Sequence, residues 1–130
     1  MRTPFYHYNW EILDETLKVA SSSASRRNYH LHYAVKANAN PKVIKKVKQH
    51  GIGADCVSAN EIIHALNNGI PAHQIVYAGV GKTDEEIQIA LEKDILCFHV
   101  ESIQELEVIN AIAVEMNKVA DVALRLNPNV

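Results

Sequence analysis

Short apolar runs alternate with amphipathic stretches along most of this chain, with a repeat of about 20 to 25 residues. The runs that we predict to be strands lie at residues 30–36, 52–57, 74–79, 95–100 and 120–126, and a helical pattern follows each of the first four. Strands separated by helices pair in parallel through right-handed crossovers, because antiparallel neighbours are joined by short hairpins. The pattern therefore predicts an α/β fold, either an open doubly wound sheet or a (β/α) barrel.

The expected helix starts carry clear capping signals. Asn40 precedes Pro41, which is a favourable first helical residue. Three further starts have the capping-box spacing of a hydroxyl residue followed by a glutamate, namely Ser58 with Glu61, Thr83 with Glu86, and Ser102 with Glu105. These pairs indicate that strands pass into helices through tight turns.

The first 28 residues differ from the repeating part. Residues 4–8 alternate bulky side chains and predict a strand, after which Asn9 is a plausible cap for a helix with Trp10, Leu13, Leu17 and Ala20 on one face. We expect the serine-rich residues 21–28 to form a solvated loop.

Composition and charge narrow the function classes. The chain has 130 residues, 48% of them hydrophobic, and a net charge of −2, so nothing indicates binding to nucleic acid or an anionic membrane. Cys56 and Cys97 each lie in an apolar run and are expected to pack as small hydrophobic side chains. Because neither a leader sequence nor a membrane-length apolar run is visible, we expect a cytoplasmic protein.

Three charged residues stand at the ends of predicted strands. Lys36 ends the first strand, Asp55 lies near the end of the second, and Arg125 ends the last. Active sites of parallel α/β folds lie at the carboxyl ends of their strands, so these side chains are candidate site residues. The alternative is structural: a buried Lys36–Asp55 ion pair with Arg125 extending into solvent. His99 ends the fourth strand and is a weaker candidate for the same site.

Two other patterns favour ordinary structural roles. His30 and His32 lie two residues apart without a cysteine or carboxylate at ligand spacing, so we expect no metal site. Residues 79–83 read Gly-Val-Gly-Lys-Thr but lack the P-loop spacing before Gly-Lys-Thr, so a strand-to-helix turn explains these glycines better than a nucleotide site.

Five motifs in order resemble one known family. They are Tyr-Ala-Val-Lys-Ala-Asn at 33–38, Gly-Ala-Asp-Cys-Val-Ser with the following Asn-Glu at 53–61, Val-Tyr-Ala-Gly-Val-Gly-Lys-Thr at 76–83, Phe-His-Val-Glu-Ser at 98–102 and Arg-Leu-Asn-Pro-Asn-Val at 125–130. Together they resemble the pyridoxal-phosphate decarboxylases of the alanine-racemase-like barrel fold, and most closely its diaminopimelate decarboxylase branch. One departure is Ala59-Asn60-Glu61, where that family more often has Gly-Gly-Glu.

The resemblance implies a cofactor, pyridoxal 5'-phosphate, and a site. Lys36 falls on the lysine that joins the cofactor covalently, Asp55 on an acidic residue lining the site, and Arg125 on an arginine near the pyridine ring. The implied reaction is decarboxylation of meso-diaminopimelate to L-lysine. Lys36 must release and rebind the cofactor, so it needs a neutral fraction near pH 7, which dry surroundings beside cationic Arg125 would supply.

The length implies an incomplete barrel. A whole (β/α)8 barrel takes about 250 residues, so we expect residues 29–130 to form about the first five βα units of a TIM-like barrel, preceded by residues 1–28 and without the family's β-domain. We expect this amino-terminal part to be inactive alone and the parent enzyme to be a homodimer. Alternatives are an ornithine, arginine or carboxynorspermidine decarboxylase, an alanine racemase, or a non-enzymatic pyridoxal-phosphate-binding barrel protein.

Overall fold

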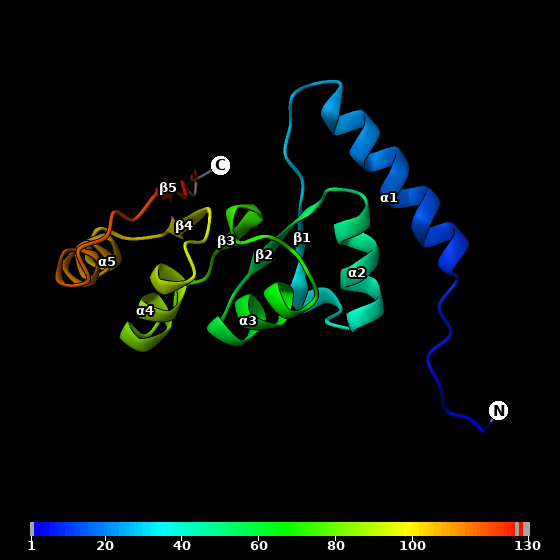
Figure 1. Cartoon of the computed structure of the whole chain (residues 1–130), viewed down its shortest axis with the longest axis horizontal. Helices are drawn as coiled ribbons and strands as arrows, with labels where there is room; N and C mark the ends of the chain where they lie inside the picture. The colour runs from blue at the N-terminus through cyan, green and yellow to red at the C-terminus, as the bar shows by residue number, and fades with distance from the viewer. Residues whose placement is uncertain (1, 127, 129–130) are drawn as a thin grey trace.

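The computed structural model describes residues 2–126 and 128, which form a curved parallel sheet with helices along one face (Figure 1). The strands are β1 (His32–Ala34), β2 (Gly53–Cys56), β3 (Ile75–Tyr77), β4 (Cys97–Val100) and β5 (Val122–Leu124). The helices are α1 (Trp10–Ser25), α2 (Pro41–Gln49), α3 (Ala59–Asn67), α4 (Asp84–Glu92) and α5 (Ile103–Glu115), with short 3-10 turns η1 (Val35–Ala37) and η2 (Ala72–Gln74).

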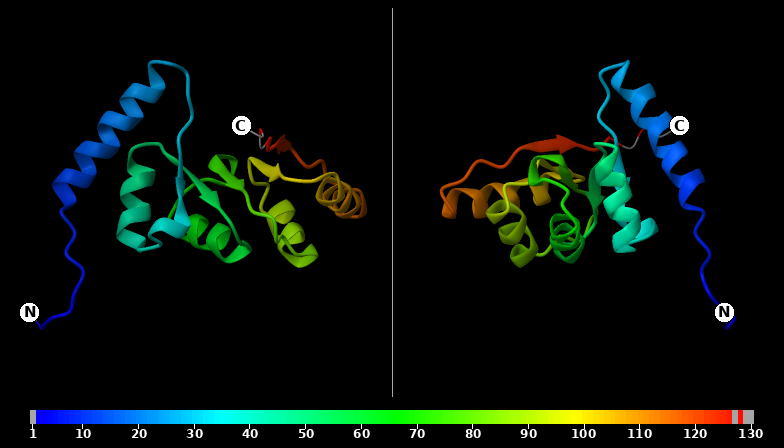
Figure 2. Two further views of the ribbon diagram at one scale, coloured as in Figure 1. Left: turned by 180° about the vertical axis from the view of Figure 1, so that it is seen from behind. Right: turned by 45° about the vertical axis from the view of Figure 1, so that its right-hand side comes forward.

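The order of the strands distinguishes a barrel from an open doubly wound sheet. All neighbours pair in parallel, and the spatial order β1-β2-β3-β4-β5 is the order along the chain. A doubly wound sheet reverses its strand order and has helices on both faces, whereas a barrel adds each strand beside the last with its helix outside. Helices α2 to α5 lie along one face (Figures 1 and 2), so the predicted partial barrel is confirmed.

Alternate residues of the strands lie on opposite faces of the sheet. The side chains that point toward the helices are apolar and almost fully buried, and they are Ala54, Cys56, Ile75, Tyr77, Phe98 and Val100. The residues between them, such as Asp55 and His99, lie on the concave face, because side chains on a strand alternate between its two sides. One face of the sheet is thus the core, and the other is available for chemistry.

The helix caps follow the sequence prediction, with one difference in detail. Each expected hydroxyl accepts a hydrogen bond from the backbone N–H three residues later, as in Ser102 Oγ from Glu105 N at 3.1 Å. Only the pair Thr83 and Glu86 is fully reciprocal. In the other two turns the glutamate accepts from the residue before the cap, Val57 at 2.9 Å and Glu101 at 2.8 Å. Each carboxylate therefore also fixes the end of the preceding strand segment.

The amino-terminal prediction is wrong at two points. Residues 4–8 form no strand, and α1 continues through residues 21–25, which we expected to be a loop. The serines stay helical because this turn packs on the domain: Ala24 is buried, and Ser21 Oγ donates to the His50 carbonyl at 2.8 Å. Tyr8 still packs against the core before α1, and the chain ahead of it extends away from the sheet (Figure 2). Tertiary contact has overridden the weak helix propensity of serine.

The two cysteines are free thiols that pack as small hydrophobic side chains, as predicted. Cys56 is buried in the core, and its burial raises the pKa of the thiol to about 12. Cys97 is half-buried, and its pKa is also raised by burial. Both side chains therefore remain protonated near neutral pH. No helix in the described part of the chain is long and apolar enough to cross a membrane.

An ion-pair cluster attaches α1 to α2 and makes that contact sensitive to acid. Asp14 Oδ1 accepts from Lys46 Nζ at 2.6 Å and lies 3.1 Å from His50 Nε2, and these two hydrogen bonds lower the pKa of Asp14 from its ordinary value. A carboxyl whose pKa is lowered in the folded state stabilises that state above its unfolded pKa and loses the effect as the pH falls through the folded pKa.

We therefore expect Asp14→Asn to lower the free energy of unfolding near pH 6, with the difference from the original chain vanishing in strong acid. Urea unfolding across a pH series measures this difference. Glu15→Gln, an exposed residue of the same helix with no ion pair among residues 2–126, is the matched control. Equal effects of the two substitutions at every pH would contradict the assignment.

The open edges of the sheet predict self-association. On β5, Val122 and Leu124 are 41% and 67% exposed, beside a backbone edge without a neighbouring strand in the described chain. Exposed apolar edge strands pair with other chains. We expect dimers or larger species by light scattering, and less of them after Leu124→Lys than after the control Val19→Lys on α1. A stable monomer at high concentration would contradict this expectation.

Candidate active site at the carboxyl ends of the strands

Lys36 lies in the turn η1, directly after β1 ends at Ala34. Its neighbour Val35 is fully buried in the core, whereas Lys36 is exposed and forms no hydrogen bond or ion pair with any described residue. The predicted position at the carboxyl end of the first strand is confirmed. The dry surroundings that we expected are not present, because this part of the chain encloses the end of β1 only partly.

The loop that carries Lys36 is held from three directions. Tyr33 Oη donates to the Asn38 carbonyl at 3.2 Å, and Asn38 Nδ2 donates to Tyr8 Oη at 3.2 Å. From α3, His64 Nε2 lies 2.7 Å from the Ala39 carbonyl oxygen. Burial raises the pKa of Tyr33, so its hydroxyl stays a donor. The lysine side chain is therefore free while its backbone is fixed, which suits a residue that must reach a ligand.

Asp55 lies on the concave face of β2, paired in register with Ala34 of β1 and Val76 of β3. Its Oδ1 atom is buried and has no hydrogen-bond partner among the described residues. The structural alternative, a buried Lys36–Asp55 ion pair, is wrong here, because Lys36 is exposed and Asp55 keeps an unpaired oxygen. An unpaired buried oxygen is costly unless a ligand or water donates to it.

His32 lies on the same concave face, two register positions before Asp55. Burial lowers the pKa of His32, and the nearby Asp55 carboxylate only partly opposes this effect. Gly53 beside it has no room for a side chain, since a Cβ there would stand 2.7 Å from the His32 ring. Within residues 2–126, no group of three or more His, Cys, Asp or Glu side chains could hold a metal ion.

Arg125 follows β5 at the opposite edge of the sheet from Lys36. Four strand spacings of about 4.8 Å separate the two positions along the sheet, so the expected placement of Arg125 beside Lys36 is wrong. The guanidinium is instead paired with Glu101, at 3.1 Å between Nη1 and Oε1. The two cations therefore lie at the carboxyl ends of the two edge strands of the sheet.

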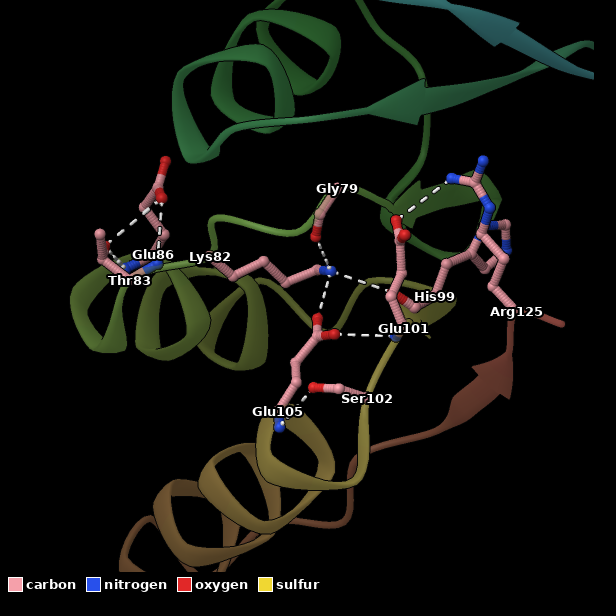
Figure 3. Close-up of polar contacts among 9 residues, drawn as sticks. All are labelled: Gly79, Lys82, Thr83, Glu86, His99, Glu101, Ser102, Glu105 and Arg125. Atoms are coloured by element: carbon pink, nitrogen blue, oxygen red, sulfur yellow. Dashed lines mark hydrogen bonds and ion pairs between the residues drawn. The ribbon is translucent and has the colours of Figure 1, made fainter. Parts of the chain in front are cut away.

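Lys82 is a residue whose role the sequence did not reveal (Figure 3). Its side chain is 1% exposed, and Nζ donates to Gly79 O at 2.6 Å, His99 O at 2.9 Å and Glu105 Oε1 at 2.5 Å. It also lies 5.2 Å from the centre of the Tyr77 ring. In the Gly-Val-Gly-Lys-Thr segment, the lysine thus binds the protein itself, and Gly79 makes the turn with φ at +105°.

The comparisons with known proteins identify the family. Residues 12–130 match the family described as pyridoxal-dependent decarboxylase, pyridoxal binding domain. The chain belongs to the pyridoxal-dependent decarboxylases. The chain is 53% identical to the diaminopimelate decarboxylase of Bacteroides thetaiotaomicron, with 100% of the chain aligned to 34% of that protein. It is 44% identical to the enzyme of the same name from Aquifex aeolicus, covering 98% of the chain and 30% of the relative.

A solved structure of the family has the same fold. The crystal structure of diaminopimelate decarboxylase from Helicobacter pylori complexed with L-lysine matches this chain with a TM-score of 0.93 at 38% identity, over 100% of the chain and 33% of that structure. The chain therefore spans about a third of the length of the relatives it matches. The likeness confirms the partial barrel and the predicted family.

The residues present fit the cofactor of this family. Pyridoxal phosphate has an aldehyde, which reacts with a primary amine, and polar ring substituents, which need hydrogen-bond partners. Lys36 offers an amine that no described residue occupies, and Asp55 offers a buried oxygen without a partner. Lys36 directly follows β1 and Asp55 lies near the carboxyl end of β2, and these two strands are neighbours in the sheet.

The buried pair of Lys82 and Glu105 predicts a strong effect on stability. Lys82→Met would leave the carboxylate of Glu105, only 13% exposed, without its cation, and breaking a buried pair in this way costs about 3–5 kcal/mol. Lys118→Met is the matched control, because its partner Asp94 is 81% exposed and a pair of that kind contributes at most about 1 kcal/mol. Urea unfolding at neutral pH compares the two. Similar losses for both variants would contradict a special role for the buried pair.

Proposed function

We propose that this chain is the amino-terminal, lysine-bearing part of a pyridoxal-phosphate-dependent diaminopimelate decarboxylase. The observation that supports this most strongly is the unoccupied amine of Lys36 at the carboxyl end of β1, within a chain of the pyridoxal-dependent decarboxylase family. The chain covers about a third of its relatives. The activity therefore belongs to the whole protein, and we expect this part to be inactive alone.

In this proposal each site residue has a distinct task. Lys36 supplies the amine that holds the cofactor covalently and that releases it when an amino-acid substrate takes its place. Asp55 accepts a hydrogen bond through its free Oδ1 atom, close to the place where Lys36 acts. Arg125, paired with Glu101, carries positive charge on the far side of the concave space. The bound cofactor supplies an electron-accepting ring for the pair of electrons left when carbon dioxide departs.

The proposed substrate is meso-diaminopimelate, which yields L-lysine when one carboxylate leaves as carbon dioxide and a proton takes its place. The relatives named above are diaminopimelate decarboxylases, and the Helicobacter pylori enzyme was solved with L-lysine, the product expected of that reaction. Decarboxylases of ornithine, arginine or carboxynorspermidine share the resemblance, but no described residue favours them. We also propose that the complete enzyme is a cytoplasmic homodimer.

A chimera tests this proposal. The matching third of the Bacteroides thetaiotaomicron relative would be replaced by this chain, and carbon dioxide release from meso-diaminopimelate would be measured with pyridoxal phosphate present. We expect activity, and its reduction by roughly 10³-fold or more in Lys36→Ala, because the covalent nucleophile is lost. Lys42→Ala, an exposed lysine at the start of α2, is the control and should keep full activity.

Two outcomes would contradict the proposal. The first is a folded chimera that binds the cofactor and is equally active with Lys36→Ala. The second is a preference for ornithine or arginine over meso-diaminopimelate, which would move the chain to another branch of the family. Circular dichroism of each variant shows whether a loss of activity reflects loss of folding.

A further inference from the structure

The buried amine of Lys82 uses all of its hydrogen-bonding capacity. An ammonium group has three N–H donors and no acceptor, and Lys82 Nζ contacts three acceptors: Gly79 O, His99 O and Glu105 Oε1. The carbonyls belong to the loop after β3 and to β4, and the carboxylate belongs to the first turn of α5. One side chain thus fixes three segments at the carboxyl ends of the strands.

The contacts continue from Lys82 toward Arg125 (Figure 3). Because Lys82 holds Oε1 of Glu105, the other oxygen, Oε2, faces the Glu101 backbone and accepts its N–H at 2.8 Å. Glu101, with a side chain 17% exposed, then accepts from Arg125 Nη1 at 3.1 Å. Every link is a charge-assisted hydrogen bond, the stronger class of such bonds in proteins.

We propose that Lys82 is a positioning residue for Arg125, acting through Glu105 and Glu101. Arginine side chains have large rotamer freedom, and the side chain of Arg125 is 55% exposed. The guanidinium is therefore positioned by its ion pair with Glu101, whose backbone is held by Glu105. Lys82 does not contact Arg125, so it acts through Glu105, whose second carboxylate oxygen holds the Glu101 backbone N–H, and through His99 O on the same segment. This inference rests on the proposed function for the cofactor-binding role of Arg125, but the placement of Arg125 is testable without it.

The chain contains a matched control for this arrangement. Lys118 also donates to a backbone carbonyl and a carboxylate, Leu91 O at 2.6 Å and Asp94 Oδ1 at 2.8 Å. These contacts lie between the end of α4 and the start of β5, at the amino ends of the strands and remote from Arg125. A substitution at Lys118 removes a similar set of bonds without touching the contacts that lead to Arg125.

The first test needs no cofactor. Hydrogen–deuterium exchange of the 130-residue chain would be followed by mass spectrometry for Lys82→Met, Lys82→Arg and Lys118→Met. We expect Lys82→Met to speed exchange around residues 99–105 and 122–126 by about tenfold or more beyond the general acceleration that its lower stability causes, with Lys82→Arg restoring most of the protection. Lys118→Met should act at residues 91–97 and 117–121 instead. Acceleration around residues 99–105 and 122–126 that does not exceed the acceleration in the rest of the chain, or the same pattern as Lys118→Met, would overturn the proposal.

The second test measures the affinity for pyridoxal phosphate by its visible absorbance in a double-mutant cycle. Lys82→Met and Arg125→Met should each weaken binding by about tenfold, and the double variant should be no weaker than Arg125→Met alone. Additive losses would mean that Lys82 does not act through Arg125. If the original chain binds no cofactor, the proposed function loses its support, and the exchange experiment still decides the positioning role.

Discussion

Parallel strand direction is the constraint on which the rest of this structure depends. Because β1 to β5 all run the same way, each strand ends on the same rim of the sheet and passes directly into a turn and a helix. The turns need caps, and the chain supplies Asn40, Ser58, Thr83 and Ser102. Lys36, Asp55 and Arg125 lie at the same rim, so the helix caps and the candidate site residues are close together.

The glutamates at the helix starts connect helix capping with the arrangement of the charged side chains near the site. Glu105 takes part in the cap of α5 through its backbone, receives Lys82 on one carboxylate oxygen and holds the Glu101 N–H with the other. Glu86 likewise bonds to its own cap and to the Ala59 N–H at the start of α3, at 3.0 Å, and these bonds lower its pKa. Adjacent βα units are therefore joined at the rim by carboxylates as well as by the apolar core.

Much of the fold and part of the candidate site could be predicted from the sequence, because the patterns that indicate them lie within short segments. The strand repeat, the caps and the ends at which Lys36, Asp55 and Arg125 lie depend on residues a few positions apart. The features that the sequence did not predict depend on contacts between residues far apart in the chain. The serine run is helical because Ala24 and Ser21 contact the rest of the domain, and the carboxylate partners of Lys82 and Arg125 stand 23 and 24 residues away along the chain. No short-range pattern encodes such pairs, and the exposure of Lys36 depends on how much of the barrel surrounds it.

The central claim is that Lys36 is the amine that receives pyridoxal phosphate. The most direct measurement is to add the cofactor to this chain at neutral pH, reduce with borohydride, and locate the pyridoxyl label by mass spectrometry. The account predicts a label concentrated on Lys36, absent from Lys36→Ala, with Lys82 unlabelled because its amine is buried. A label spread evenly over the exposed lysines of α2, and unchanged in Lys36→Ala, would contradict it.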